Sequence, residues 1–282
     1  MRPVPGPRPA VACAAVREHP SEVSVVTHRL HRRQLLWQGV VGAGALTAGP
    51  GLLRSLVPTL GPLLPVVAVS PPTIIGREQW GADESLRRRQ PDFAPISRLI
   101  VHHTVTSVDE PDPAARVRAI YAYHVQGNGW DDIGYNFVVD AAGRVYEGRA
   151  TGNGRHDGED DAGRGVVGAH AGGHNTGSVG VAILGTYTSE GITPTDAALD
   201  AVSAIAAWKF GPRTIDPVAA GTLIGHRDVT PTGCPGNGCY RRLPEVRERT
   251  RALIASAASP IPAAGDKGLV ENLLDTVGGL LG

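Results

Sequence analysis

Cysteine is scarce in this chain. Three cysteines occur among 282 residues, at positions 13, 234 and 239, and three are too few for a disulfide framework. Cys234 and Cys239 could close one very small loop, but Cys234 also has a competing use that is described below. The scarcity therefore excludes the class of small scaffolds that disulfides hold together.

Net charge is missing too, because 27 basic and 27 acidic residues cancel. Residues 1–70 hold seven arginines and only two acidic residues, so 20 basic and 25 acidic residues remain beyond position 70. A region with an acidic excess lacks the basic surface that nucleic acid requires, and we exclude nucleic acid as a partner. Glycine and proline are plentiful, with 37 and 23 residues, and predict long irregular stretches near the ends.

Residues 1–70 have the pattern of an export signal followed by a Pro-rich segment. The pair Arg32-Arg33 precedes a mildly apolar region, and small residues follow near position 70; this order is typical of twin-arginine signals. A membrane anchor is the alternative, but a spanning helix needs about 20 consecutive apolar residues, and Gly39, Gly42 and Gly44 interrupt this region. We expect export by the twin-arginine route to the cell wall or the extracellular space, without stable membrane insertion after signal removal.

Beyond residue 72 the chain alternates between strand and helix patterns. Short apolar runs predict buried strands, and Gly143 supplies the turn of a hairpin. Apolar residues at helical spacing predict two helices, the second opened by a Thr-Pro-Thr-Asp capping signal. The predicted strands are residues 98–104, 135–140, 145–147, 178–184 and 223–225, and the predicted helices are residues 113–126 and 195–210.

This alternation predicts an α/β fold with a central mixed β-sheet flanked by helices. We expect a single domain over residues 72–256 and a mobile tail over residues 257–282, where alanine, proline and glycine dominate before a weakly amphipathic end. Residues 148–165 are rich in glycine, aspartate and arginine and have no apolar period, so they predict a loop.

Histidines and a cysteine stand at the ends of the predicted strands. His102 and His103 close one strand, His226 closes another, and Cys234 follows eight residues later. Two imidazoles and a thiolate suit a catalytic zinc ion, which takes three protein ligands and keeps a fourth position for water. Ordinary hydrogen-bonded histidines are the alternative. The pattern thus indicates a zinc site at the strand ends.

Five ordered segments of the sequence resemble the peptidoglycan recognition protein family, which belongs to the type 2 N-acetylmuramoyl-L-alanine amidases. The resemblance covers roughly residues 73–250 and implies an enzyme that acts on bacterial peptidoglycan, a muramyl peptide. The matching segments are residues 99–104 (LIVHHT), 129–137 (GWDDIGYNF), 167–171 (VGAHA), 175–185 (NTGSVGVAILG) and 225–236 (GHRDVTPTGCPG).

The resemblance also implies a role for individual residues. The zinc ligands would be His102, His226 and Cys234. Tyr135 matches the family's assisting phenol, and Thr232 matches a position that holds Thr or Lys in active members. The candidate substrate contacts are His170 and Asn175, which match positions near the family's groove, together with Trp130 and His103.

These roles predict hydrolysis of the amide bond between N-acetylmuramic acid and L-alanine. Zinc would polarise the carbonyl and activate water, while the Tyr135 hydroxyl would stabilise the oxygen that gains charge. Tyr135 could instead be a core residue and Thr232 a turn residue. Two other readings stay open: a non-catalytic peptidoglycan-binding protein, whose relatives generally lack the cysteine, and a structural zinc site with His103 as the fourth ligand.

Overall fold

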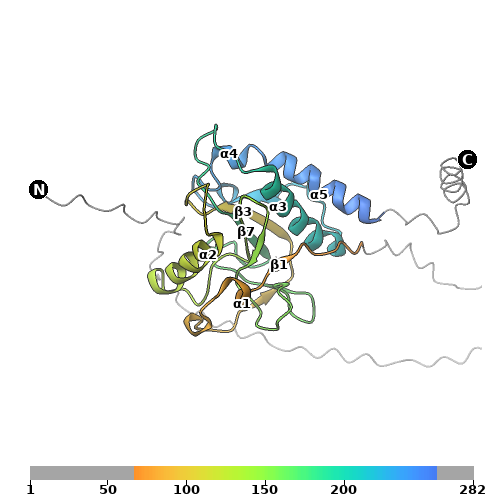
Figure 1. Ribbon diagram of the computed structural model, residues 1–282. Coiled ribbons are helices and arrows are strands. Elements are labelled where there is room, and N and C mark those ends of the chain that lie inside the picture. The colour runs from red at the N-terminus through yellow and green to blue at the C-terminus, as the bar shows by residue number, and fades with distance from the viewer. Residues whose placement is uncertain (1–66, 259–282) are drawn as a thin grey trace, which may run out of the picture. The chain divides into compact units, whose positions relative to one another are not determined.

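The computed structural model of the chain describes residues 67–258 (Figure 1). The arginine pair, the apolar region after it and residues 259–282 of the predicted tail lie outside the described residues. The strands are β1 (Ile74–Ile75), β2 (Phe93–Ala94), β3 (Arg98–His103), β4 (Phe137–Val139), β5 (Val145–Glu147), β6 (Gly165–Val166), β7 (Ser178–Ile183) and β8 (Leu223–Gly225). The α-helices are α1 (Arg77–Trp80), α2 (Pro113–Ala122), α3 (Asp196–Phe210), α4 (Asn237–Tyr240) and α5 (Leu243–Ala258). Among the described helices, none has both the length and the apolar content to cross a membrane.

A six-stranded sheet forms the centre of the domain, in the order β1-β5-β4-β7-β3-β8. The β4–β5 hairpin is antiparallel, and the other four pairings are parallel. A separate antiparallel pair joins β2 to β6. The sheet is therefore mixed, which confirms the predicted α/β fold class.

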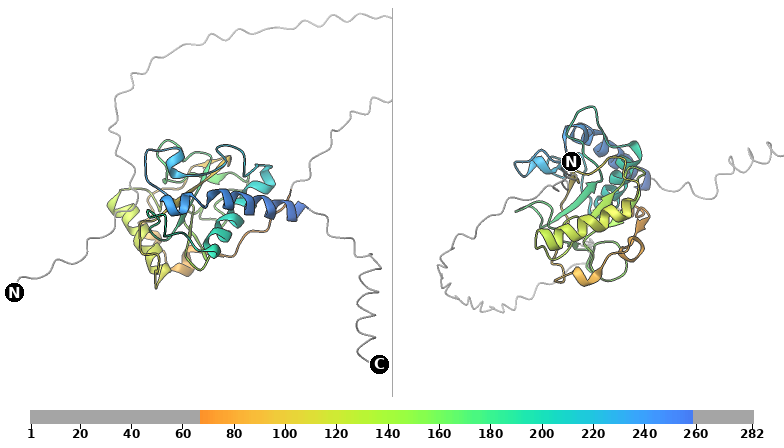
Figure 2. Two further views of the ribbon diagram at one scale, coloured as in Figure 1. Left: turned by 90° about the horizontal axis from the view of Figure 1, so that it is seen from above. Right: turned by 60° about the vertical axis from the view of Figure 1, so that its left-hand side comes forward.

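Helices cover both faces of this sheet, with α3 and α5 on one face and α1 and α2 on the other (Figures 1 and 2). All six residues of β7 and five of the six in β3 are buried. Strands that are covered on both faces read as continuous apolar runs rather than as alternating ones. This explains why the runs in the sequence predict both central strands.

Local signals set where the two predicted helices begin. Thr195 caps α3 by accepting a hydrogen bond from the Ala198 amide at 3.1 Å, and Asp112 caps α2 by accepting one from the Ala115 amide at 2.9 Å. Both helices are confirmed. The last predicted turn of the first one differs, because Tyr123–Gly127 is a π-helix.

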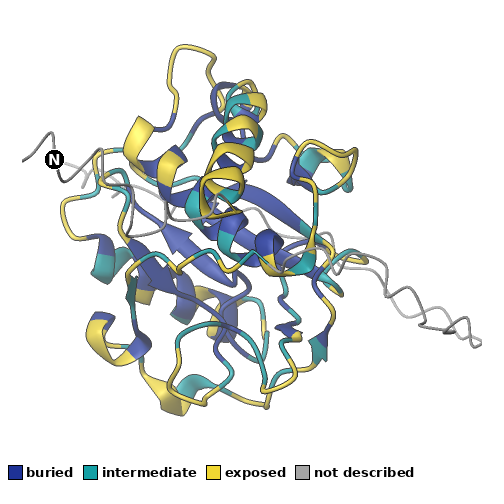
Figure 3. Ribbon diagram, turned by 90° about the vertical axis from the view of Figure 1, so that its right-hand side faces the viewer, coloured by how far each residue is buried: buried dark blue, intermediate teal, exposed yellow. Residues whose placement is uncertain are grey.

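Helix α5 is absent from the sequence prediction, although it runs for 16 residues along α3. Its buried residues are only Leu243, Val246 and Thr250, so no apolar stripe runs along its whole length. Figure 3 shows that the outer face of this region is exposed whereas the strands beneath are buried. Ion pairs to α3, such as that between Arg249 and Asp196 at 2.9 Å, supplement the small apolar contact.

The insertion at residues 148–165 folds as turns rather than as a helix, as its composition predicts. Its Glu159 carboxylate pairs with Lys209 and Arg213, at 2.5 Å each. Lys209 lies in the last turn of α3 and is buried, which lowers the pKa of its ammonium group to about 8. The insertion is thus attached to the C-terminal end of α3.

Candidate metal centre

Two neighbouring parallel strands carry histidines to the same edge of the sheet. Val101 of β3 lies in register with Gly225, the last residue of β8. His102 is the next residue of β3, and His226 directly follows the end of β8. Their ring centroids lie 4.4 Å apart at an interplanar angle of 49°, and both side chains are buried. Parallel pairing thus brings together two residues that are far apart in the sequence.

Cys234 reaches the histidines on the loop after β8. The Arg227 amide donates to the Cys234 carbonyl at 2.9 Å, and the His103 amide donates to the Cys234 sulfur at 3.4 Å. The sulfur then lies 3.7 Å from Nδ1 of His102. One ligand atom from each of the three predicted ligands lies within 4.8 Å of the other two: His102, His226 and Cys234.

Cys234 and Cys239 are buried and form no disulfide, so the alternative of a bridge between them is wrong. Cys239 lies in α4 and packs into the apolar core beneath α3 and α5. Burial raises the pKa of its thiol to about 12. Only one of the two sulfurs faces the histidines.

Two glycines of the loop that holds Cys234 should respond differently to substitution by alanine. Gly236 has φ +86°, and a Cβ there would lie 2.2 Å from the Tyr187 carbonyl oxygen, whereas a Cβ on Gly233 would meet nothing within 4 Å. Gly236→Ala is expected to lower the free energy of unfolding by ~2–4 kcal/mol, and the matched Gly233→Ala by no more than ~0.5 kcal/mol. Urea unfolding of both variants checks this, and equal losses would contradict it.

Three histidines in and beside the cluster, His102, His124 and His170, are held in the neutral form. Burial lowers the pKa of His102 well below its usual value, and the nearby imidazoles of His170 and His226 lower it further. Burial likewise lowers the pKa of His170 and of His124 to about 3, with the charge of Arg149 adding to the effect at both. Neutral imidazoles keep the lone pairs that metal binding requires.

These depressed values predict a pH dependence of stability. The unfolded chain protonates these histidines near pH 6.5, but the folded state does not do so at His124 and His170 until about pH 3. The free energy of unfolding is therefore at its full value above pH 6.5 and should fall below it by about 1.4 kcal/mol per pH unit for each histidine. Urea unfolding of zinc-free protein between pH 7 and 5 measures the slope. His124→Phe should remove one histidine's share, and a pH-independent midpoint would refute the assignment.

Tyr135 lies beside the cluster on the segment that leads into β4. Its ring centroid is 5.4 Å from that of His102 and 5.3 Å from that of His124, and the residue is buried. The Gly134 amide donates to Nδ1 of His124 at 3.0 Å, and the Arg149 guanidinium donates to the Ile133 carbonyl at 3.0 Å. These bonds hold the backbone before Tyr135 against two neighbouring segments.

Thr232 lies two residues before Cys234 in the same loop. Its hydroxyl oxygen accepts a hydrogen bond from the Cys234 amide at 3.2 Å, and the residue is half-buried. The threonine therefore helps to shape the loop that presents the sulfur.

Three of the four candidate substrate contacts, His170, Asn175 and Trp130, lie in or next to the histidine cluster. His170 Nδ1 lies 3.0 Å from Nε2 of His102. The Asn175 carboxamide oxygen accepts from the His170 amide at 2.8 Å and so shapes the loop that carries that histidine. Trp130 is half-buried, with its ring 4.6 Å from that of His124.

His103 is directed to the other face of the sheet. Successive side chains of a strand point to opposite faces of the sheet, so His103 points away from the side that His102 occupies. There its Nδ1 accepts a hydrogen bond from the Tyr187 amide at 3.2 Å. Within residues 67–258, no fourth histidine, cysteine, aspartate or glutamate joins the three grouped ligand atoms. The arrangement therefore lacks the fourth protein ligand that a closed structural zinc site needs.

Two residues next to the candidate centre were missed by sequence reasoning. His124 lies on the buried side of the helical segment after α2. Its spacing with the apolar residues of that helix predicts this side, but it does not predict a place beside the candidate centre. Ser178 begins β7, and its hydroxyl lies 3.3 Å from Nε2 of His170. The turn between them brings that serine back to His170, because its hydroxyl also contacts the carbonyl oxygens of His174 and Asn175.

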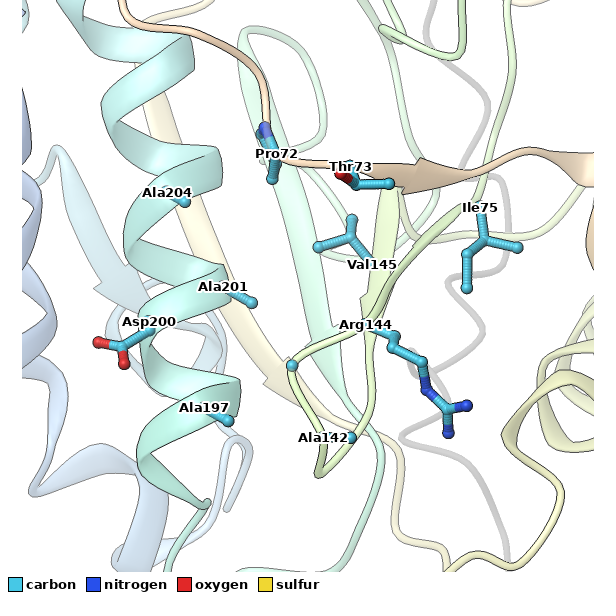
Figure 4. A pocket seen from close by; sticks show the side chains of 11 residues that line it. Pro72, Thr73, Ile75, Ala142, Arg144, Val145, Ala197, Asp200, Ala201 and Ala204 are labelled. Atoms are coloured by element: carbon cyan, nitrogen blue, oxygen red, sulfur yellow. The ribbon is translucent and has the colours of Figure 1, made fainter.

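A pocket of about 580 Å³ lies elsewhere, between α3 and the β1–β5 edge (Figure 4). Three alanines of α3 line one wall, and the charged residues at its rim, Arg144 and Asp200, are paired with other side chains. No histidine or cysteine lines the pocket, and its one carboxylate, Asp200, is paired with Arg249. The histidine cluster is the better candidate site.

Comparisons with known proteins show what the chain is similar to. The N-acetylmuramoyl-L-alanine amidase family matches residues 92–237. The chain is 37% identical to the N-acetylmuramoyl-L-alanine amidase of Sus scrofa over 61% of its own length but only 27% of the pig protein. It is 33% identical to peptidoglycan-recognition protein 1 of Holotrichia diomphalia, over 64% of this chain and 83% of that protein. An X-ray structure of bumblebee PGRP-SA aligns with 31% identity and a TM-score of 0.49, covering 61% of this chain and 94% of the other.

Proposed function

The chain belongs to the family of N-acetylmuramoyl-L-alanine amidases and peptidoglycan recognition proteins, and from this premise we propose that it is a zinc-dependent amidase. The reaction would hydrolyse the amide bond between N-acetylmuramic acid and L-alanine in peptidoglycan. The observation that carries the proposal is the grouping of two buried imidazoles and one buried thiol at one edge of the sheet.

The donor set fits zinc in chemistry and in spacing. Zinc binds sulfur at about 2.3 Å and imidazole nitrogen at about 2.0–2.1 Å. Tetrahedral geometry then puts sulfur and nitrogen ligands about 3.6 Å apart, and the distance between Cys234 Sγ and His102 Nδ1 is 3.7 Å. His102, His226 and Cys234 would hold the ion.

Bound zinc would supply a Lewis acid that polarises the amide carbonyl and makes water a better nucleophile at neutral pH. The chain's own contribution is to exclude solvent from the ligands and to stabilise charge. Tyr135 would donate a hydrogen bond from its hydroxyl to the carbonyl oxygen as that oxygen becomes anionic. Thr232 would act beside it as a second polar contact while holding the Cys234 amide.

Substrate contacts form the next part of the proposal. Asn175 lies next to the histidine cluster because it bonds the loop that carries His170. Trp130 lies next to it because its ring packs on that of His124. We propose that both residues contact the muramyl peptide. His103 would pack behind the strand instead, because its ring bonds the Tyr187 amide on the opposite face. Peptidoglycan recognition is also what the names of the related proteins state for those proteins.

Mass analysis of fragments from a defined muramyl peptide tests the proposed reaction. The zinc-loaded protein should release a stem peptide with a free L-alanine amino group and leave a free lactyl carboxylate on the sugar. Chelation should stop release, and added zinc should restore it. Binding of the muramyl peptide without any release would instead support the non-catalytic alternative.

Export would bring the proposed enzyme to its substrate, because peptidoglycan lies outside the cytoplasmic membrane. The twin-arginine route is part of this proposal and rests on Arg32 and Arg33 and on the apolar region and small residues that follow them. Replacing both with lysine should retain the protein inside the cell, as fractionation of a bacterial host would measure. Unchanged secretion of that variant would reject the route without affecting the proposed chemistry.

A further inference from the structure

We propose that His170 and Ser178 form a hydrogen-bond relay that selects the tautomer of His102 and leaves its Nδ1 lone pair for the metal. The inference rests on the proposed zinc site and assigns His170 a positioning role in place of the predicted substrate contact. Neither residue is among the three grouped ligands.

The relay runs from the backbone of one loop to the ring of His102. The Ser178 hydroxyl donates to the carbonyl oxygen of His174 or Asn175, at 2.8 and 2.9 Å. The same oxygen lies 3.3 Å from Nε2 of His170, and Nδ1 of His170 lies 3.0 Å from Nε2 of His102. Three successive polar contacts thus link the loop to the candidate metal ligand.

The direction of every bond follows from the first one. A carbonyl can only accept, so the single hydroxyl proton of Ser178 points to the backbone and its oxygen must accept from Nε2–H of His170. A neutral imidazole that donates through one nitrogen accepts through the other. His170 Nδ1 therefore accepts from Nε2–H of His102, and Nδ1 of His102, which faces the Cys234 sulfur at 3.7 Å, carries the lone pair.

Two glycines leave the space that the His170 ring fills. A Cβ at Gly180 of β7 would lie 2.3 Å from Cδ2 of His170, and a Cβ at Gly168 would lie 2.5 Å from the same atom. Asn136 holds Gly180 in place, because its side-chain oxygen accepts from the Gly180 amide at 2.7 Å. Asn175 accepts from the His170 amide at 2.8 Å.

Both ring nitrogens of His170 are therefore engaged with protein atoms, and the residue is 5% exposed. No ring nitrogen is left to contact a substrate. Partners of this kind fix the orientation of a metal-binding imidazole, and their loss typically weakens metal affinity by ~10–100-fold.

The test compares variants at position 170 in the full chain. His170→Leu keeps the volume but removes the acceptor, so the zinc Kd, measured by competition with a chromophoric chelator, should rise by ~10–100-fold. His170→Asn places a carboxamide oxygen where Nδ1 stood and should restore the Kd to near the wild-type value. A folded His170→Leu protein with wild-type zinc affinity would overturn the proposal.

A matched pair of serines separates the relay from general destabilisation. Ser178→Ala removes the acceptor of His170 and should weaken zinc binding. Ser203→Ala removes a buried hydroxyl that donates to the Leu199 carbonyl at 2.8 Å inside α3, and should leave the zinc Kd unchanged. Equal effects of both variants on the Kd would also overturn the proposal, and this pair decides the matter if His170→Leu fails to fold.

Imidazole ¹⁵N chemical shifts give a readout that does not need the metal. In the zinc-free protein His102 should carry its proton on Nε2, and in His170→Leu its tautomers should become mixed. A proton on Nδ1 of His102 in the wild-type protein would reject the relay. If the wild-type protein takes up no zinc at all, the proposed amidase function fails, and the tautomer measurement still decides the relay by itself.

Discussion

Replacing Cys234 with alanine is expected to remove zinc and to lower kcat/KM for muramyl peptides by ~10³-fold or more, which corresponds to about 4 kcal/mol of transition-state stabilisation. Within residues 67–258 this sulfur is the one thiol beside His102, at 3.7 Å from its Nδ1. Without it two imidazoles remain, fewer than the three protein ligands of a catalytic zinc site. Zinc content after dialysis and the rate of peptide release measure the two effects.

Cys239→Ala is the matched control for this variant. Cys239 is also buried and outside any disulfide, but it packs in the core under α3 and α5 rather than beside the histidines. Its removal should cost some stability and leave one bound zinc with an unchanged rate. A Cys234→Ala protein that keeps both its zinc and its rate would exclude the proposed metal centre.

Replacing Tyr135 with phenylalanine is expected to lower kcat by ~10²–10³-fold, the usual loss when one donor to the charged oxygen is removed. Zinc content and KM should change little, because the ring remains beside His102 and only the hydroxyl is lost. Steady-state kinetics on a muramyl peptide, together with metal analysis, distinguish this pattern from a folding defect.

Tyr146→Phe provides the control for the loss of a buried hydroxyl. Tyr146 lies in β5 and donates to the Asp140 carboxylate at 3.0 Å, away from the histidine cluster. This variant should lose stability without losing activity. If Tyr135→Phe cleaves at the wild-type rate, the tyrosine is a core residue and the donor role is rejected.

The elements of the fold that the sequence predicts are those with strong local signals. Helix α3 begins at the Thr195 cap and β7 is a continuous apolar run, so neither needs information from distant residues. Helix α5 is not predicted because most of its residues are not buried and its partner, α3, lies far away in the sequence. Arg249 of α5, for example, bonds Asp196 of α3, some 50 residues earlier. A helix that is stabilised by long-range ion pairs and a few buried residues leaves no clear apolar period.

The candidate site likewise has a part that the sequence predicts and a part that only the tertiary structure shows. By itself, the sequence determined which residue types end the strands and which segments supply them: His102, His226 and Cys234 come from a histidine pair, a short strand end and a Gly/Pro loop. Only the tertiary structure decided that these three lie together, because the parallel register of β3 and β8 has no local signature.

The tertiary structure also decided which face each histidine serves. Strand alternation sends His102 toward Cys234 and His103 toward the Tyr187 amide, and β7 brings Ser178 behind His170. Hydrogen-bond direction along such a chain depends on groups that meet only after folding. The sequence shows which hydrogen-bonding and metal-binding groups a residue carries, whereas tertiary packing determines which partner each group meets.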